Sequence, residues 1–497
     1  MIATLALLCT AIAVGRLRFV HDFPDWDVAT YTLIGAEMSG GERLYADVWD
    51  MKPPGIFASF AIAEWITRGS HEWSAYVLST LAAMTTTIAI YFAAAALAGC
   101  GQLTVAFALD EQRGGQPSRS IGLWAAAIWT CVSLQPALGG PLPNTEAFIN
   151  ALLAIAIAAA ISRRLIIAGA ALAIASLFKQ VAIAPALAIA IWLYFAGNGS
   201  RPRAAIRSAA MVAAIPLAWP ILGAYFAVTD RGDLFYQTNC VYSRFYGGSV
   251  VANLLSAFEP SHLFPRAMIE LLPLVLLAGV GIAISSHRPL LIALVFGSWI
   301  AVALPGRFFE HYYQLWLVPL SLAGACAIAS MQRRLAVAVG SIVCIGLLIL
   351  QAHWWVLAPR DRAAALHPAS TFLYVTDVGT ELRTILRSDE TMFAWCDEPQ
   401  LYWLARKHPP TVGLWKQHLT EGPMSKSLAR QTLAALQRNP PDLVAASAGD
   451  IDASGEPIAR WIAENYIALP NNATRFPLAI YARKGSDLSR RAAPALP

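Results

Sequence analysis

Apolar stretches of bilayer-spanning length recur along the first 357 residues, and they constrain the fold more than any other feature of the sequence. A membrane-crossing helix needs about 20 consecutive apolar residues. Eleven stretches are candidate spans: 1–19, 73–99, 120–138, 146–162, 165–178, 181–197, 208–228, 268–286, 289–305, 312–330 and 335–357. The chain is 57% hydrophobic and 13% charged, whereas a soluble domain carries roughly 25% charged residues. The sequence therefore predicts a mainly α-helical polytopic membrane protein.

Charge and cysteine content argue against two other classes of protein. The net charge of +5 is modest, and the basic residues fall in short loops rather than in a patch that would bind nucleic acid. The seven cysteines include no CxxC pair and give no disulfide framework. We expect membrane lipids among the partners of this chain, and no nucleic acid.

The loops between the candidate spans alternate in charge. One set carries a series of arginines: Arg113, Arg119, Arg163, Arg164, Arg201, Arg203, Arg207, Arg288, Arg333 and Arg334. The positive-inside rule places these loops in the cytoplasm. The other set then lies on the outer face, and it comprises 20–72, 139–145, 179–180, 229–267 and 305–311. With eleven spans, the N-terminus is inside and everything after residue 357 is outside.

Composition changes after Trp355, where short helical and extended patterns begin to alternate. We predict helices at 370–387, 399–407, 424–438 and 457–468, and strands at 391–396, 411–415, 442–447 and 475–483. Such alternation is typical of one small α/β domain. The sequence therefore predicts two domains, a transmembrane domain at 1–357 and an extracytoplasmic α/β domain at 358–497.

The first outer loop gathers acidic side chains next to the membrane. They are Asp25, Asp27, Glu37, Glu42, Asp47 and Asp50. Lys52 follows them, directly before two prolines. Ionisable groups close to hydrocarbon cost free energy and are functional candidates for that reason. The apolar stretch Pro54–Trp65 is too short to cross a bilayer, so we predict an interfacial helix there.

Further polar residues fall in the other outer loops. They are Asn144, Glu146, Lys179, Arg307, His311 and Tyr312. A cationic side chain can hold a lipid phosphate at headgroup level, and a carboxylate can take a proton from an incoming hydroxyl. Acids, cations and aromatic residues on one membrane face therefore suggest a site for a sugar carried on a polyprenyl phosphate, with the phosphate as leaving group.

The first outer loop also carries an ordered motif, D-x3-Y-x5-E…G-x2-LY-x-D-x2-D-x-KPPG, from Asp27 to Gly55. It resembles the GT-C superfamily of polyprenyl-phosphate-dependent glycosyltransferases, in the branch of the protein O-mannosyltransferases and the lipid A aminoarabinose transferases. The likeness extends over most of the membrane region, since Glu146 opens the fourth span, Lys179 ends the fifth and an R-x3-HY segment precedes the tenth. It implies a GT-C-like fold and inverting sugar transfer by a single displacement, on the periplasmic side of a bacterial inner membrane.

The resemblance also implies roles for individual positions. The base of the family is an Asp four residues before an aromatic residue, which matches Asp27, with Asp25 as a competitor. The lysine of the KPP motif, near the donor phosphate, matches Lys52, and the basic residue after the fifth span matches Lys179. Arg307 is a further candidate for the phosphate. The expected substrate contacts are Tyr31, Asp50, Asn144, Glu146, His311 and Tyr312.

The chain departs from the family at two positions. The residue before the KPP lysine is acidic in some relatives and helps to bind a metal, but here it is Met51, with Asp50 adjacent. We therefore assign no metal ligand and leave a divalent metal open as the one cofactor. Many members carry an acidic pair where this chain has Asp27 and Val28, and Glu146 is the candidate replacement for the second acid.

Each assignment has a simpler structural alternative. Asp27 or Asp25 can cap a helix, and Lys52 can anchor the chain at the interface. Three other functions also remain open: a lipid-linked sugar transporter or flippase, a non-catalytic scaffold of the same fold and a metal-dependent hydrolase of lipid phosphates. A transporter would carry polar groups at mid-depth in the bilayer, whereas the charges here gather at one face. The acceptor hydroxyl can belong to a lipid, a glycan or a protein.

Overall fold

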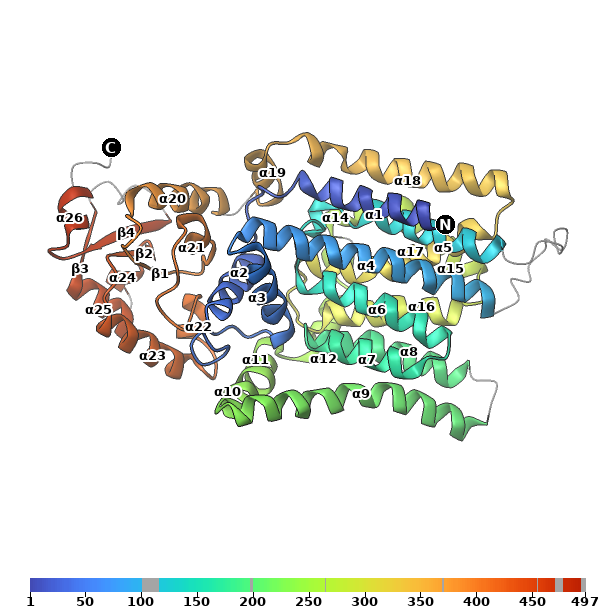
Figure 1. Cartoon of the computed structure of the whole chain (residues 1–497), viewed down its shortest axis with the longest axis horizontal. Coiled ribbons are helices and arrows are strands. Elements are labelled where there is room, and N and C mark those ends of the chain that lie inside the picture. Colours follow the sequence, from blue (N-terminus) through green and yellow to red (C-terminus); the bar gives the residue numbers. More distant parts are fainter. Residues whose placement is uncertain are drawn as a thin grey trace. The chain divides into compact units, whose positions relative to one another are not determined.

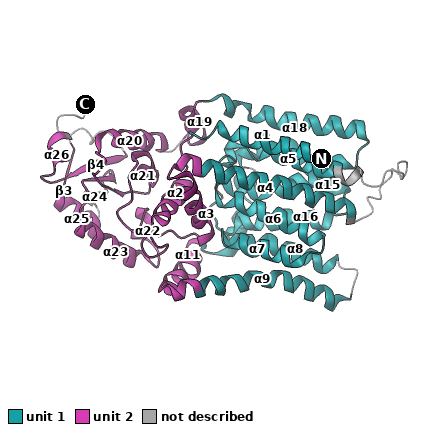
Figure 2. Cartoon of the chain, in the orientation of Figure 1, with its two compact units in different colours: residues 1–21, 75–224, 247–357 teal, residues 22–74, 225–246, 358–497 magenta. Residues whose placement is uncertain are grey.

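The computed structural model describes residues 1–100, 116–196, 200–263, 265–368, 371–453, 455–469 and 477–492. The chain separates into two compact units (Figure 2). The helical unit comprises residues 1–21, 75–224 and 247–357, and the mixed unit comprises residues 22–74, 225–246 and 358–497. The domain boundary predicted at residue 357 is one of the limits between the units, and the assignment of two domains stays a prediction. Arg113 and residues 475–476 of the last predicted strand lie outside the described residues.

Long helices that run side by side build the helical unit (Figure 1). They are α1 (Ile2–Leu17), α4 (His71–Cys100), α5 (Gln116–Val132), α6 (Thr145–Ile161), α7 (Leu165–Ser176), α8 (Ile183–Phe195), α9 (Arg201–Val228), α15 (Leu272–Ile284), α16 (Arg288–Ala303), α17 (Leu317–Ala329) and α18 (Arg333–Val356). Shorter elements join them: η1 (Pro136–Leu138), η2 (Gln180–Ala182), α12 (Val250–Ser256), α13 (Pro260–Leu263), α14 (Arg266–Glu270) and η4 (Glu310–Trp316). Each of the eleven predicted spans overlaps one of the long helices.

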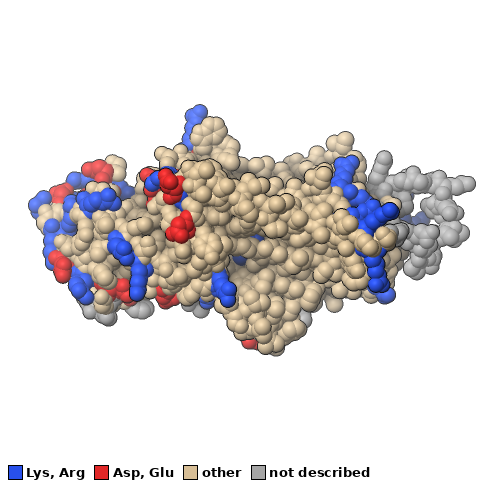
Figure 3. Space-filling model, turned by 90° about the horizontal axis from the view of Figure 1, so that it is seen from below, with Lys and Arg blue, Asp and Glu red and all other residues tan. Residues whose placement is uncertain are grey.

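Four helical segments among the described residues are long and apolar enough to cross a bilayer. They are α4, α9, α18 and the continuous segment Glu310–Ala329, which contains α17. The other apolar helices have between 10 and 17 residues, so the number of crossings stays a prediction. Figure 3 shows a broad surface without charged side chains, which ends in a band of Lys and Arg.

Small residues let the helices of this unit approach one another closely. Gly281 of α15 lies against the backbone of Ala323 in α17, and Gly297 of α16 lies against Pro185 and Ala188 of α8. A Cβ atom at either glycine would overlap these neighbours. Contacts between small residues are a common way to pack helices in membranes, where the apolar lipid gives no hydrophobic drive for association.

The mixed unit begins with two packed helices, α2 (Trp26–Ser39) and α3 (Pro54–Thr67). They come together at Gly35, whose missing side chain leaves room for Phe60. Helix α3 begins at Pro54, a favoured first residue because proline has no N–H to leave unpaired there. The structure therefore contains the predicted helix, which exposes Ile62, Trp65 and Ile66. Its interfacial position stays a prediction.

A second segment of the mixed unit contains α10 (Gly232–Tyr236), the π-helix η3 (Gln237–Tyr242) and α11 (Ser243–Gly247). A π-helical turn inside a helix is rare and costs stability, so it usually has a local purpose. Here it buries Thr238 and Asn239, and both side chains donate or accept hydrogen bonds with residues of the first outer loop. The segment thus holds that loop in place.

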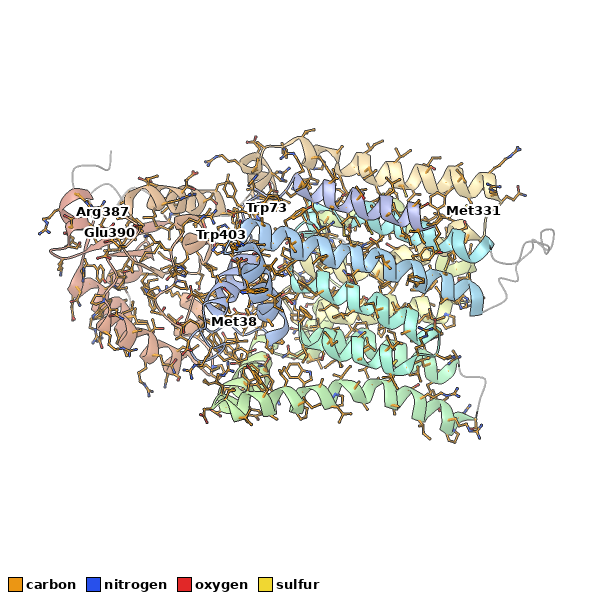
Figure 4. All side chains as sticks on the ribbon, in the orientation of Figure 1. Met38, Trp73, Met331, Arg387, Glu390 and Trp403 are labelled. Carbon is orange, nitrogen blue, oxygen red and sulfur yellow. The ribbon has the colours of Figure 1, made fainter. Side chains whose placement is uncertain are left out.

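The tail of the chain folds around a four-stranded sheet of order β1-β2-β4-β3. Its strands are β1 (Met392–Trp395), β2 (Leu443–Ser447), β3 (Tyr466–Ala468) and β4 (Leu478–Arg483). The pair β1 and β2 is parallel, with Met392 opposite Leu443, and the other two pairs are antiparallel. Glu390 precedes β1, accepts a hydrogen bond from the backbone N–H of Arg387 (Figure 4) and pairs with Arg491.

Four helices of the tail lie close to predicted positions: α20 (Phe372–Ile385), α21 (Gln400–Ala405), α23 (Ser425–Arg438) and α25 (Pro457–Asn465). The sequence did not predict α19 (Pro359–Leu366), α22 (Lys416–Thr420), α24 (Asp450–Ala453) or α26 (Asp487–Ala492). The ring of Trp403 in α21 (Figure 4) packs against His71 at 5.2 Å between ring centroids. The α/β character of the tail was thus predictable from the alternating pattern.

Two predicted elements of the tail are wrong. Residues 411–415 form no strand, because their backbone meets the first outer loop through a single bridge between Gly413 and Trp49. The helix predicted at 457–468 ends at Asn465, because Tyr466–Ala468 pairs with β4 as strand β3. Both errors arise because pairing partners distant in the sequence decide whether a short apolar run becomes a strand.

Candidate active site

The two acids at the start of α2 have different positions. Asp25 is the N-cap, and its Oδ1 accepts a hydrogen bond of 2.6 Å from the backbone N–H of Val28. A carboxylate is well suited to this position, since it pairs one of the unpaired N–H groups of the first turn. Asp27 lies within the first turn of the helix. The capping alternative therefore applies to Asp25, and the side chain of Asp27 is directed elsewhere.

A buried loop of the mixed unit carries Lys52. Tyr45 adopts a left-handed backbone with φ of 70°, and its hydroxyl donates a 2.8 Å hydrogen bond to the carbonyl of Lys52. The backbone N–H of Lys52 donates to Oδ1 of Asp50 at 3.0 Å. The indole N–H of Trp49 donates to Thr238 at 2.8 Å. These bonds fix the backbone of the loop on both sides of the lysine.

The Lys52 ammonium lies between an acid and an aromatic ring. Its Nζ is 3.5 Å from Oδ1 of Asp27, and the two side chains are 9% and 23% exposed. The same Nζ lies 5.7 Å from the centroid of the Tyr31 ring, within the range of a cation–π contact. Tyr31 packs in turn on Phe57 and Phe60 of α3. The distance between Nζ of Lys52 and Oδ1 of Asp27 is thus long for an ion pair, and the Asp27 carboxylate is partly exposed to solvent.

Asp50 has a more enclosed environment than Asp27. It is 3% exposed. Burial raises the pKa of Asp50 to about 6, and the nearby Lys52 ammonium opposes this rise only in part. Its carboxylate accepts the backbone N–H of Lys52. Its main observed task is therefore to shape the loop that carries the lysine.

The described residues offer little to a metal ion. No group of three or more His, Cys, Asp or Glu side chains with suitable placement occurs among them. The residue before Lys52 is Met51, whose thioether is a poor ligand for hard divalent cations. Met51 therefore adds no hard oxygen ligand beside Lys52.

A second charged pair lies in the helical unit. Glu146 is in the first turn of α6, after the N-cap Asn144. Its Oε1 lies 2.7 Å from Nζ of Lys179, and its Oε2 accepts a 3.0 Å bond from the hydroxyl of Thr145. The side chains of Glu146 and Lys179 are 0% and 8% exposed. The ion pair is thus short and enclosed, and each carboxylate oxygen of Glu146 accepts a hydrogen bond.

An interruption between two helices positions the lysine of this pair. Lys179 has an extended backbone, with φ of −161° and ψ of 131°, between α7 and η2. Its Nζ lies 3.4 Å from the centroid of the Tyr312 ring, a close cation–π contact. Phe178 stacks on Phe148 at 4.7 Å and ties the interruption to α6. The lysine is thus held by a carboxylate and a ring face together.

The segment that precedes α17 completes the group in the helical unit. The ring of His311 lies edge-on to Tyr312 at 4.7 Å. Gly139, in a left-handed turn with φ of 64°, lies so close to Asn144 and His311 that a side chain there would contact both. Arg307 is exposed.

The predicted residues thus form two groups, one in each unit. The first contains Asp25, Asp27, Tyr31, Asp50 and Lys52, and the second contains Asn144, Glu146, Lys179, His311 and Tyr312. Glu146, the candidate second acid, pairs with Lys179 within the helical unit. Their roles in catalysis stay predictions.

Sequence reasoning missed several residues around the first group, above all Trp49, Trp415 and His418. His418 is 7% exposed and packs edge-on against Trp49 at 5.0 Å between ring centroids. No local pattern identifies it, because its contacts join segments that are hundreds of positions apart. The only local signal is the presence of Trp415 and His418 in LWKQH, of which only Leu414 and Trp415 fall in the strand predicted at 411–415.

Comparison with known proteins identifies the fold. No protein-family model matches the chain, and no curated protein matches it in sequence. Among solved structures, ArnT from Cupriavidus metallidurans bound to undecaprenyl phosphate matches with a TM-score of 0.59 and 13% identity, over 98% of each chain. The apo state of the same protein matches with a TM-score of 0.58 and 14% identity, over 97% of each chain. The fold expected from the resemblance of the first outer loop is therefore confirmed, since the chain shares it with ArnT.

Proposed function

We propose that this chain is an integral-membrane glycosyltransferase that moves a sugar from a polyprenyl phosphate to an acceptor hydroxyl. The observation that carries the proposal is the pair formed by Asp27 and Lys52, in which a partly solvated carboxylate lies 3.5 Å from a lysine ammonium. Transfer from a lipid phosphate needs a proton acceptor and a cation close together. The fold shared with ArnT, one of whose structures holds undecaprenyl phosphate, supports the same class of donor.

In the proposed reaction, Asp27 is the general base. It accepts the proton of the acceptor hydroxyl, whose oxygen forms a bond to the anomeric carbon of the sugar. The bond from that carbon to the phosphate oxygen breaks at the same time, and the electron pair leaves with the polyprenyl phosphate. One displacement inverts the anomeric configuration. Lys52 stabilises the charge that develops on the leaving phosphate, as a fixed cation does in phosphate-leaving reactions.

For the helical unit we propose a role in donor binding. The ammonium of Lys179 lies 2.7 Å from Glu146 and 3.4 Å from the centroid of the Tyr312 ring. In this proposal Lys179 and Arg307 bind phosphate oxygens, and Asn144, Glu146, His311 and Tyr312 contact the substrate. In the mixed unit, Tyr31 and Asp50 also contact the substrate. A hexose or pentose and a lipid, glycan or protein acceptor all fit this chemistry.

We further propose that the protein lies in a bacterial inner membrane with eleven crossings. The loops that carry the first group, and residues 358–497, lie on the periplasmic side. The band of Lys and Arg at one end of the uncharged surface (Figure 3) supports this orientation, because basic loops stay in the cytoplasm.

The direct test is a donor panel with the purified protein in detergent or nanodiscs. Each polyprenyl-phosphate sugar is offered with mixed acceptors, and release of free polyprenyl phosphate is measured by mass spectrometry. At least one donor is expected to release it at a rate that the Asp27→Asn variant does not reach, while that variant still binds the donor. Movement of an intact lipid-linked sugar across vesicles, without release from any donor, would instead establish a transporter. Binding without release or movement would establish a scaffold.

A further inference from the structure

A short segment of the tail packs against both elements that carry the Asp27–Lys52 pair. We call residues 412–418 the strap. The carbonyl of Val412 accepts a 2.9 Å hydrogen bond from the backbone N–H of Trp49, and Gly413 forms an isolated bridge with the same residue. Trp49 lies three positions before Lys52 in the buried loop. The first end of the strap is therefore bonded to the loop that carries the lysine.

The middle of the strap is bonded to the helix that carries the acid. The indole N–H of Trp415 donates a 3.0 Å hydrogen bond to Oγ1 of Thr30. Thr30 is buried in α2, three positions after Asp27, and its hydroxyl donates to the carbonyl of Trp26 at 2.8 Å. This contact fixes the first turns of α2, where Asp27 lies.

The last residue of the strap fills the space beside both contacts. The ring of His418 lies 5.0 Å from Trp49, 5.7 Å from Tyr242 and 5.9 Å from Trp415, between ring centroids. Burial, and then the Lys52 ammonium, lower the pKa of His418 to about 3. The imidazole is therefore neutral at physiological pH and adds no positive charge near the lysine. It acts as an aromatic filler that holds Trp49 against Trp415.

We propose that the strap is a positioning element that fixes Asp27 relative to Lys52, with Trp415 and His418 as its positioning residues. The inference rests on the proposed function, and it makes the tail a working part of the enzyme. Neither residue touches the reacting atoms in this proposal. Both act through the elements that carry the pair.

The need for such an element follows from the geometry of the pair. Asp27 and Lys52 are 25 positions apart and lie on different local structures, a helix and a loop. Their 3.5 Å separation is too long for the ion pair to hold the two elements by itself. A misplacement of about 1 Å between reacting groups can cost roughly a hundredfold in rate. The strap adds a tie to both elements beyond the packing of α2 on α3 at Gly35 and Phe60.

The test is a double-mutant cycle on the bond between Trp415 and Thr30. Trp415→Phe keeps an aromatic ring and removes the indole N–H, and Thr30→Val keeps the shape and removes the hydroxyl. Each single variant is expected to lower kcat about tenfold, within the range that small misplacements cause. The donor KM and the melting temperature should stay near the wild-type values. The double variant should be no slower than either single variant, because both changes break the same bond.

A matched control comes from the same tail. Trp461→Phe makes the same chemical change at a tryptophan that packs against Tyr466 in α25 and β3. It should leave kcat unchanged. A loss of kcat in Trp461→Phe equal to that in Trp415→Phe would show a general effect of tryptophan loss, and it would overturn the proposal.

His418 gives an independent second measurement. His418→Phe keeps a ring among Trp49, Tyr242 and Trp415 and should retain most of the wild-type kcat. His418→Ala removes the ring and should lower kcat without a change in donor KM. Wild-type kcat in both Trp415→Phe and His418→Ala would overturn the proposal even though transfer itself occurs. Failure of the proposed function looks different, because the wild-type protein would then release no polyprenyl phosphate from any donor.

Discussion

The two lysine–carboxylate pairs of this molecule have the same chemistry and opposite environments. Asp27 and Lys52 in the mixed unit are 3.5 Å apart, with the acid 23% exposed. Glu146 and Lys179 in the helical unit are 2.7 Å apart, with the acid fully buried. The second pair also has a hydroxyl donor on the acid and a ring face under the lysine.

This difference indicates what each pair can do. A partly solvated carboxylate at a long distance from its partner can exchange that partner for a substrate hydroxyl without a large desolvation cost. In a buried pair at short distance, separating the two ions would leave each charge buried without compensation, at a large cost in free energy. We therefore interpret Asp27–Lys52 as the reactive pair and Glu146–Lys179 as the pair that keeps a lysine in one fixed position.

The largest expected effect is the loss of turnover when Asp27 is changed to its amide. Asp27→Asn removes the proposed base and should lower kcat by roughly 10² to 10⁴-fold, the range for a general base. Its thermal unfolding should change little, because the pair is long and partly solvated. Steady-state release of polyprenyl phosphate and a melting curve on the same preparation test both statements. Turnover near the wild-type rate in Asp27→Asn would remove Asp27 from the mechanism.

Asp25 provides the neighbouring control for that experiment. Asp25→Asn keeps a good N-cap and should alter neither turnover nor stability much, whereas Asp25→Ala should lose about 1 kcal/mol of stability. If Asp25→Asn is as inactive as Asp27→Asn, the division of roles between the two acids is wrong.

The second prediction concerns stability, when each lysine is changed to Met. Lys179→Met leaves the Glu146 carboxylate buried without a cation and should cost about 3–5 kcal/mol of unfolding free energy. The double variant Glu146→Gln, Lys179→Met should regain most of that loss, because no buried charge remains. Lys52→Met should cost no more than about 1 kcal/mol, since its partner is partly solvated. Denaturant titrations of the wild type and the three variants in one detergent measure the differences, and equal losses for the two lysine variants would contradict the comparison.

The third prediction concerns how the unfolding free energy depends on pH through Asp50 of the mixed unit. The pKa of Asp50 is raised to about 6 from an ordinary value of 3.8, with burial as the main cause. The folded state therefore holds this proton more tightly than the unfolded state. The resulting stability is fully present below about pH 4 and is lost as pH rises through about 6, on the order of 3 kcal/mol in all. The difference in unfolding free energy between Asp50→Asn and wild type should accordingly grow from pH 4 to pH 6 and then stay level. A difference that does not vary with pH would refute the assignment.

Much of the fold could be predicted from the sequence, because hydropathy and charge alternation act locally. The positions of the long helices followed from apolar stretches, and α3 followed from Pro54 and a short apolar run. The strand predicted at 411–415 failed, since Gly413 pairs with Trp49 and not with a strand of the tail. Local patterns hold no information on such distant partners.

The same limit applies to the candidate site. Asp27, Lys52, Glu146 and Lys179 could be named because ionisable residues beside apolar stretches are conspicuous in the sequence. Which acid pairs with which lysine could not be derived, and Glu146 was expected to act with Asp27. His418 could not be found at all, because a buried neutral histidine among aromatic rings has the same local sequence as a surface one.

The smallest expected effect separates the two contacts that hold Lys179. Tyr312→Phe keeps a ring face 3.4 Å from Nζ and should change stability by less than about 0.5 kcal/mol. Tyr312→Leu removes the ring and should cost about 1–2 kcal/mol, because a desolvated cation–π contact is lost while the carboxylate remains. The corresponding pair at Tyr31, whose ring lies 5.7 Å from Lys52, should show a smaller difference between Phe and Leu that arises mainly from packing on Phe57 and Phe60. If the Phe-to-Leu difference is larger at Tyr31 than at Tyr312, the ring holds the lysine of the mixed unit more firmly than that of the helical unit, and the contrast between a movable and a fixed pair is reversed.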